Sequence, residues 1–220
     1  NLEHDTDNAE DNSLVQVDSD TYALAYTGAG TDGFISTFTI DSSGDITAVK
    51  TQSEGNNLEH DTDNAEDNSL VQVDSDTYAL AYTGADDDGF ISTFTIDSSG
   101  DITAVKTQSE GNNLEHDTEQ VRHNSLVQVD SDTYMLAYQG TGTGEISTFT
   151  IDSSGNITAI LTQSEGNNLE HHTKRSEFNS LVQVDSDTYA LAYRDTASGH
   201  SSKGAITAFN ISTDAPTVVI

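Results

Sequence analysis

Four copies of one unit fill this chain of 220 residues. The motif LEHDT, or a close variant of it, begins at Leu2, Leu58, Leu114 and Leu169 and is followed each time by NSLVQVDSDTY. The period is therefore 56, 56 and 55 residues, and the first two units are almost identical. Self-similarity at a fixed period requires the fold to be assembled from one repeated supersecondary element.

Each unit alternates apolar and polar residues with a period of two, which predicts strands. In the first unit these strands are NSLVQVD, TYALAYTG, GFISTFTID and ITAVKTQ, separated by SDT, a loop rich in Gly and Asp, and SSGD. The strands are rich in Val, Ile, Thr, Tyr and Phe, and the Asp-Ser-Ser-Gly segment is typical of turns. Each unit is therefore predicted to be a four-stranded antiparallel meander, and helical repeats are excluded.

The two faces of each predicted sheet differ in side-chain size. In the second strand Tyr22, Leu24 and Tyr26 point to one face, and Ala23 and Ala25 point to the other. A sheet that is apolar on both faces must be covered on both sides. Stacking the bulky face of one unit on the small face of the next, around a ring, satisfies this requirement.

The unit length, the four-strand meander and turns such as DSSGDI make the chain resemble β-propeller blades, and in particular acidic repeats of marine-bacterial or metagenomic origin. No WD, Kelch or Asp-box signature accompanies these features. We expect an all-β, four-bladed β-propeller that forms one domain over residues 1–220, with blades at about 1–56, 57–112, 113–167 and 168–220. A β-solenoid and four separate sandwiches are the minor alternatives.

The last unit stops inside its predicted fourth strand, so the two chain ends are expected to meet and close the ring. The competing interpretations are a segment of a longer array and half of an eight-bladed ring made by two chains. Because the units are nearly identical, self-association or exchange of blades between chains is also expected.

Acidic residues dominate the composition, with 38 Asp and Glu against 7 Lys and Arg and a formal net charge of −31. This charge excludes nucleic acid as a partner and argues against anionic membranes, and the short apolar runs give no membrane insertion. The chain contains no Cys. Disulfides, thiol nucleophiles and zinc–thiolate sites are therefore excluded.

The units differ mainly in two segments that a propeller would place on the same rim: the one before the first strand and the loop between the second and third strands. Variable loops on a fixed scaffold are typical of recognition sites, although drift of exposed loops explains the variation equally well. The candidate ligand-binding residues in these segments are Arg122, His123, Lys174, Arg175, Phe178, Arg194 and His200. His123 and His200 also break the repeat, which makes them the best of the few catalytic candidates.

The sequence alone suggests two kinds of metal site, and it requires no cofactor. Alternating carboxylates predict calcium at Asp5, Asp7, Asp11, Asp61, Asp63, Asp67, Asp86, Asp87 and Asp88. Imidazoles that recur once per unit could surround the axis and bind a transition metal: His4, His60, His116 and His171. The alternative for the carboxylates is a solvated acidic surface, and for the histidines it is hydrogen bonding between neighbouring blades.

We expect a non-catalytic binding module whose variable rim recognises a glycan or a protein, in an extracellular or cell-surface location. Near-identical units and the lack of one distinctive catalytic constellation favour this interpretation. A structural or self-assembly module of a surface protein is the second alternative. A hydrolase or lyase with its site at the channel mouth is the third.

Overall fold

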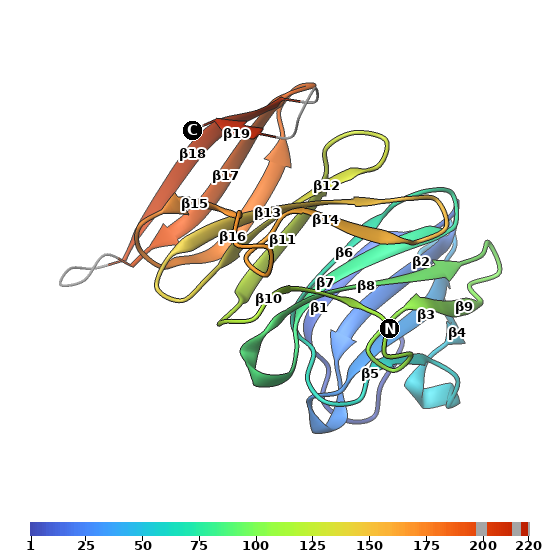
Figure 1. The fold of residues 1–220 in the computed structure, drawn as a ribbon. Helices are drawn as coiled ribbons and strands as arrows, with labels where there is room; N and C mark the ends of the chain where they lie inside the picture. Colours follow the sequence, from blue (N-terminus) through green and yellow to red (C-terminus); the bar gives the residue numbers. More distant parts are fainter. Residues whose placement is uncertain (197–201, 213–216, 220) are drawn as a thin grey trace.

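Four antiparallel sheets, one from each repeat, make up the protein (Figure 1). The computed structural model describes residues 1–196, 202–212 and 217–219. The first sheet contains β1 (Glu10–Gln16), β2 (Thr21–Thr27), β3 (Gly33–Ile40), β4 (Ile46–Lys50) and β5 (Leu58–Asp61). The second contains β6 (Glu66–Gln72), β7 (Thr77–Thr83), β8 (Gly89–Ile96), β9 (Ile102–Lys106) and β10 (Leu114–Asp117).

The third sheet contains β11 (Arg122–Gln128), β12 (Thr133–Gln139), β13 (Gly144–Ile151), β14 (Ile157–Leu161) and β15 (Leu169–His172). The fourth contains β16 (Ser176–Gln183), β17 (Thr188–Asp195), β18 (Lys203–Ser212) and β19 (Thr217–Val219). Three single-turn 3-10 helices, Ala29–Thr31, Gln52–Glu54 and Ala85–Asp87, lie between strands. The expected four-stranded meander is therefore present in every unit.

Among the described residues, no helix is long and apolar enough to cross a membrane.

The LEHD segment of each unit adds a fifth strand to the sheet before it. In the first sheet, β4 pairs with the second half of β3, and β5 pairs with the first half, where Gly33 lies opposite Asp61 and Ile35 opposite Leu58. The same pairing joins β10 to β8 and β15 to β13. The first three sheets therefore begin nine residues later and end five residues later than the predicted repeat boundaries, and each of them is tied to the next unit by backbone hydrogen bonds.

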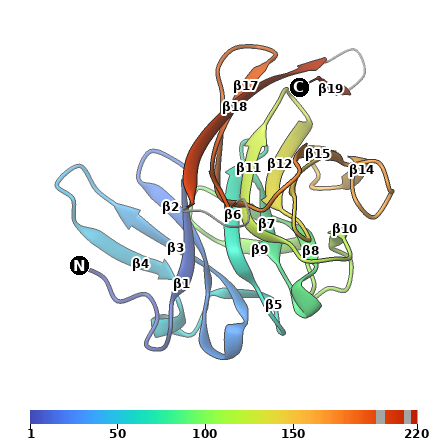
Figure 2. The same ribbon diagram turned by 90° about the vertical axis from the view of Figure 1, so that its left-hand side faces the viewer.

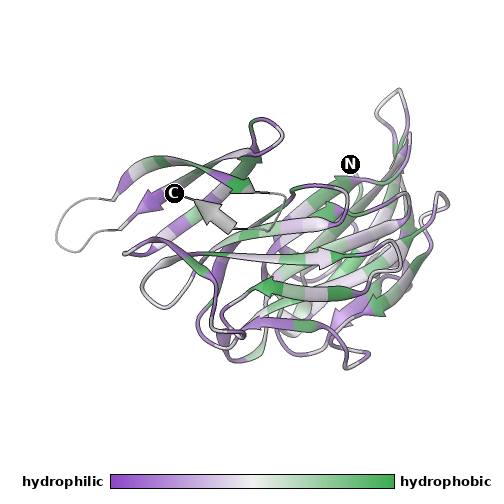
Figure 3. Cartoon of the chain, turned by 45° about the horizontal axis from the view of Figure 1, so that its top comes forward, coloured by the Kyte–Doolittle hydropathy of each residue, from purple (hydrophilic) through white to green (hydrophobic). Residues whose placement is uncertain are grey.

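The predicted stacking of bulky faces on small faces is confirmed. One core cluster combines Ala23, Ala25 and Ile35 of the first sheet with residues of the second that include Tyr78 and Leu80. Equivalent clusters join the second sheet to the third and the third to the fourth. Burial of these apolar side chains between sheets is the main favourable contribution to folding. The alternation of apolar and polar residues along the strands is visible in Figure 3.

The four blades form an open arc, and the expected closure of a four-bladed ring is wrong for this structure. The chain ends lie apart in both views, at opposite ends of the arc (Figures 1 and 2). Leu14 of the first blade is 56% exposed, whereas its equivalents Leu70 and Leu126 are 6% and 7% exposed. Ring closure would have covered Leu14 as the neighbouring blades cover the other two.

Candidate functional site

A β-bulge interrupts the first strand of every blade at the same position. The pairing of this strand with the second shifts register between Glu10 and Ser13, and likewise in the other three units. The bulged residues all have left-handed backbone conformations, with φ of 49° at Asp11, 53° at Asp67, 57° at His123 and 54° at Phe178. This conformation is costly for a residue other than Gly, and such strain concentrates at functional sites.

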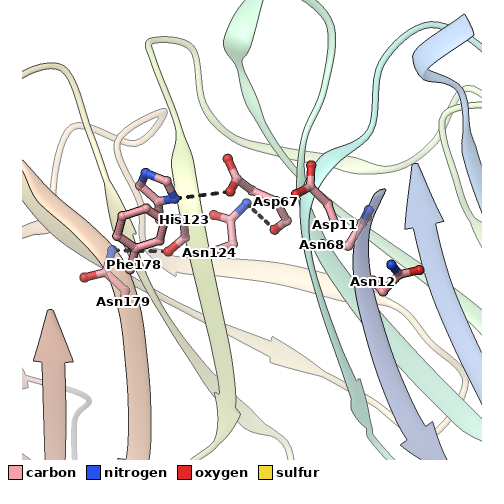
Figure 4. Close-up of a pocket in the computed structure, with 8 residues that line it drawn as sticks. All are labelled: Asp11, Asn12, Asp67, Asn68, His123, Asn124, Phe178 and Asn179. Atoms are coloured by element: carbon pink, nitrogen blue, oxygen red, sulfur yellow. Dashed lines mark hydrogen bonds and ion pairs between the residues drawn. The ribbon is translucent and has the colours of Figure 1, made fainter. Parts of the chain in front are cut away.

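The four bulges come together in one pocket of about 310 Å³. It is lined by the bulged residues and by the Asn that follows each of them, namely Asp11, Asn12, Asp67, Asn68, His123, Asn124, Phe178 and Asn179 (Figure 4). Because β1, β6, β11 and β16 are neighbours along the inner side of the arc, the pocket lies where the propeller axis would run. The structure thus unites residues that the sequence had assigned to two separate hypotheses, calcium binding and rim recognition.

His123 and Asp67 form the titratable pair of this pocket. Nδ1 of His123 lies 3.3 Å from Oδ1 of Asp67. Burial opposes ionisation of Asp67, but hydrogen bonds from the side chain and backbone of His123 outweigh it, so the pKa of this carboxyl is lowered. Asp67 is therefore an acceptor that can hold the imidazole in one orientation and tautomer.

Phe178 forms an apolar wall beside this pair. Its ring lies 4.5 Å from the His123 ring, centroid to centroid, and its side chain is 62% exposed. The guanidinium of Arg194 lies 4.7 Å from the centroid of the Phe178 ring and is ion-paired with Glu177. An exposed aromatic ring between an imidazole and a cation offers a stacking surface to a planar or apolar ligand.

The asparagines of the pocket were missed in the sequence because they are invariant among the units. Asn124 Nδ2 donates to the Asp67 carbonyl at 3.2 Å, and Asn179 Nδ2 donates to the His123 carbonyl at 3.2 Å. Each therefore holds the bulge of the preceding blade. The only signal in the sequence was an Asn that follows a variable residue in all four units.

The other candidates for ligand binding lie outside this pocket. Arg122 is bound to Glu66 at 3.0 Å and to Asp87 at 2.7 Å, so it links the second and third blades. Lys174 and Arg175 are exposed in the segment before β16. His200 lies outside the described residues. Of the six candidates that the structure describes, His123 and Phe178 line the pocket, and Arg194 lies beside Phe178.

The recurrent histidines do not form an axial metal site, and that hypothesis is wrong for this structure. His60 packs edge-on against Tyr82, and His116 against Tyr138, each inside a different interface between blades. The same edge-on contact joins His4 to Tyr26 and His171 to Tyr193. Complete burial lowers the pKa of His60 and His116 to about 3. These imidazoles are therefore neutral packing groups.

The carboxylates proposed as calcium ligands are divided between several places, and three of them, Asp63, Asp86 and Asp87, line a second pocket of about 530 Å³. Asp5 and Asp61 accept the backbone N–H two residues later, from Asp7 and Asp63, and Asp61 also accepts a hydrogen bond from Tyr82 Oη at 2.9 Å. The remaining candidates lie at the central pocket and in the loop before β8: Asp11, Asp67, Asp86, Asp87 and Asp88. Within the described part of the chain, no group of three or more His, Asp or Glu side chains is placed to hold a metal ion.

Comparison with known proteins places the repeats in a described family. The model of the family "Lactonase, 7-bladed beta-propeller" matches residues 2–172. A search of curated proteins found no match.

Solved propeller structures resemble the whole arc. A GH43 β-1,3-galactosidase has a TM-score of 0.54 at 13% identity, over 90% of this chain and 42% of that one. A subtype N11 neuraminidase-like protein of A/flat-faced bat/Peru has a TM-score of 0.54 at 11% identity, over 99% and 53%. NanB sialidase from Streptococcus pneumoniae has a TM-score of 0.53 at 10% identity, over 84% and 28%. The chain therefore spans about half or less of the length of these structures, and the likeness shows a propeller fold.

These findings contradict the expected non-catalytic binding module. The family that matches three of the four units is named for an enzyme. The near-identity of the units favoured a non-catalytic interpretation. That inference failed because a single His at one bulge is enough to make the site on the axis asymmetric. Of the three functions expected from the sequence, the hydrolase is the one whose class agrees with the name of the matching family.

Proposed function

Because the chain belongs to the lactonase family of seven-bladed β-propellers, we propose that it is a hydrolase that opens a cyclic ester in the central pocket. The observation that carries the proposal is the His123–Asp67 pair, held on two bulged strands in a pocket large enough for a small ring. A pocket with convergent polar groups and a perturbed acid is the usual form of an active site.

The chemistry of this pair suits ester hydrolysis. With Asp67 accepting the hydrogen bond of Nδ1–H, Nε2 of His123 is free to accept a proton from water. That water adds to the ring carbonyl carbon, the bond from this carbon to the ring oxygen breaks, and the proton passes from His123 to the alkoxide that leaves. The product is a hydroxy acid, and no group besides water is consumed.

Two features of the pocket favour an uncharged substrate with an apolar part. Phe178 provides a flat surface beside the imidazole, and Asp11 and Asp67 line the other blades. With a net charge of −31, the protein repels an anionic substrate, and it also repels the carboxylate that ring opening creates. The charge would thus assist product release.

Cleavage of glycosides, the chemistry of the GH43 structures, is less well supported by the pocket. It ordinarily requires two carboxyl groups that flank the scissile bond. Among the eight residues that line the pocket, only Asp11 and Asp67 have carboxyl groups, and Asp67 is engaged by His123.

The proposal is tested with three probes: dihydrocoumarin as an uncharged aromatic lactone, a carboxylated lactone, and a p-nitrophenyl galactoside. We expect hydrolysis of the first, slower hydrolysis of the second at low salt with a difference that shrinks as salt is added, and none of the third. Absence of lactone hydrolysis, or cleavage of the glycoside alone, would overturn the proposal.

The extracellular or cell-surface location remains a prediction and is tested by fractionation of the source cells.

A further inference from the structure

The four asparagines that line the central pocket occupy equivalent positions in the units, yet their side chains form different hydrogen bonds. Three of them donate from Nδ2 to the carbonyl three residues earlier: Asn12 to Ala9 at 3.4 Å, Asn68 to Ala65 at 3.3 Å and Asn179 to Ser176 at 3.0 Å. This bond stays within one segment and so fixes no neighbouring blade.

Two of the asparagines hold a bulge of the preceding blade. Asn124 donates to the carbonyl of Asp67 and Asn179 to the carbonyl of His123, each at 3.2 Å (Figure 4). At the equivalent interface Asn68 donates instead to Thr27 Oγ1, which is outside the bulge, at 3.4 Å. Among the described residues, the bulges held in this way are therefore the two that carry the His123–Asp67 pair.

Ser176 sets the last of these asparagines apart. The other units have an apolar residue at its position, namely Ala9, Ala65 and Val121. Ser176 is fully buried, and its Oγ donates to Oδ1 of Asn179 at 2.5 Å. Among the described residues, Oδ1 of Asn68 and Oδ1 of Asn124 are buried without a partner. Because Ser176 occupies the amide oxygen of Asn179, the amide nitrogen is directed at the His123 carbonyl.

This carbonyl belongs to the bulge that aims the imidazole. His123 has φ of 57°, a conformation that persists in a residue other than Gly only where the surroundings hold it. Rotation of the peptide would carry the ring away from Asp67, whose Oδ1 is 3.3 Å from Nδ1. A misplacement of about 1 Å is enough to cost an active site most of its rate.

We propose that Asn179, oriented by Ser176, is the positioning residue of His123. Its amide holds the bulge so that Nδ1–H of the imidazole stays on Asp67 and Nε2 is left free for the proton of water. The effect on rate rests on the proposed function, but the effect on the imidazole does not and can be measured without a substrate.

The first test is the tautomer of His123. Long-range 15N–1H NMR spectra at about pH 8, where an ordinary imidazole is neutral, show which ring nitrogen carries the proton. The signals lost in His123→Asn identify this residue among the seven histidines. We expect the proton on Nδ1 in wild type and a mixture of tautomers in Asn179→Ala.

Two further variants complete this test. Asn12→Ala removes an equivalent asparagine whose described bond stays within its own segment, and the tautomer of His123 should be that of wild type. Ser176→Ala restores the residue of the first two units, so it should fold, and it should shift the tautomer less than Asn179→Ala. Circular dichroism checks the fold of each variant. An unchanged tautomer in both Asn179→Ala and Ser176→Ala, or an equal change in Asn12→Ala, would overturn the proposal.

The second test is the kinetics of lactone opening. Asn179→Ala should lower kcat by about tenfold and Ser176→Ala by about threefold, with KM nearly unchanged in both. A higher KM with an unchanged kcat would show that Asn179 binds the substrate, and it would overturn the positioning role. If wild type opens no lactone, the proposed function fails, and the NMR spectra alone decide whether Asn179 positions His123.

Discussion

The carboxyl of Asp67 and the imidazole of His123, equivalent positions in adjacent blades, are joined across the inner side of the arc, with 3.3 Å between Oδ1 and Nδ1. In the first blade the same position is Asp11, and in the fourth it is Phe178. Four nearly identical strands thus place two carboxylates, one imidazole and one phenyl ring in the same pocket. The repeat supplies the geometry, and single substitutions in the bulges supply the chemistry.

Replacing Asp67 with Asn should reduce kcat for the lactone by at least about tenfold with little change in KM, since Asp67 positions the base and does not touch the ring. The variant keeps the shape of the side chain, so the pocket should stay intact. Asp195→Asn is the matched control, because Asp195 is paired with His172 at 3.2 Å away from the pocket. Steady-state kinetics of both variants test this role. Equal losses of kcat in Asp67→Asn and Asp195→Asn would contradict it.

Acidification should destabilise the protein through its buried histidines. Above pH 6.5 their imidazoles are neutral in the folded and unfolded chains, and no stability depends on pH through them. As pH falls from 6.5 towards the folded pKa of about 3, the unfolded chain takes up a proton that His116 in the folded chain does not. The free energy of unfolding should therefore fall by up to about 1.4 kcal/mol per pH unit for this residue.

The comparison of wild type with His116→Leu isolates this effect. Burial raises the pKa of Asp117, which acts in the opposite direction as pH falls, but this contribution is common to both proteins. Denaturant unfolding at pH 7, 6 and 5 should show a smaller loss of stability for the variant. Parallel pH profiles for the two proteins would mean that the buried imidazole binds protons in the folded state.

Phe178→Asn should raise the melting temperature and weaken substrate binding. Phe178 has φ of 54°, a conformation that Asn adopts more readily, and relief of this strain is worth about 1 kcal/mol. Because the ring is largely exposed, little apolar burial is lost. Loss of the flat surface should raise KM. A lower melting temperature together with an unchanged KM would show that the ring serves packing and not the substrate.

Arg122→Ala should lower the free energy of unfolding by about 1 kcal/mol or less, because its ion pairs with Glu66 and Asp87 are partly exposed. The loss should shrink as salt is added, since screening weakens both the ion pairs and the repulsion within a chain of net charge −31. Thermal unfolding in low and high sodium chloride tests this. A loss that is independent of salt would indicate that Arg122 acts by packing.

The sequence was sufficient to predict the strands and the way that blades stack. Tyr78 and Leu80 lie on the bulky face of the second sheet and pack on Ala23 and Ala25 of the first. The alternation of large and small residues along each strand predicts this stacking, because large side chains must fill the space that small ones leave. The LEHD strand was not predictable from alternation, since it is four residues long and its partner lies in the preceding unit. The open arc depends on the angle between blades, which no local pattern specifies.

The pocket was predictable only in part. Asp11, Asp67, His123 and Phe178 occupy one variable position, but the bulge that turns them to the axis arises from backbone pairing between β1 and β2 and its repeats. Because the bulge adds a residue and shifts the pairing register, the period of two along the strand does not predict where these side chains point. The histidines recur once per unit, which suggested an axial metal site as one hypothesis, yet their burial against Tyr82 and its equivalents removes them from the axis.

The central claim is that His123 acts as the base of a lactonase, and the most direct test is the initial rate of dihydrocoumarin opening by wild type, His123→Asn and His172→Asn at equal protein concentration. The account predicts that His123→Asn lowers the rate by about 100-fold or more. It predicts that His172→Asn, which alters the other His–Asp pair, leaves the rate near that of wild type. Equal rates for wild type and His123→Asn would contradict the account.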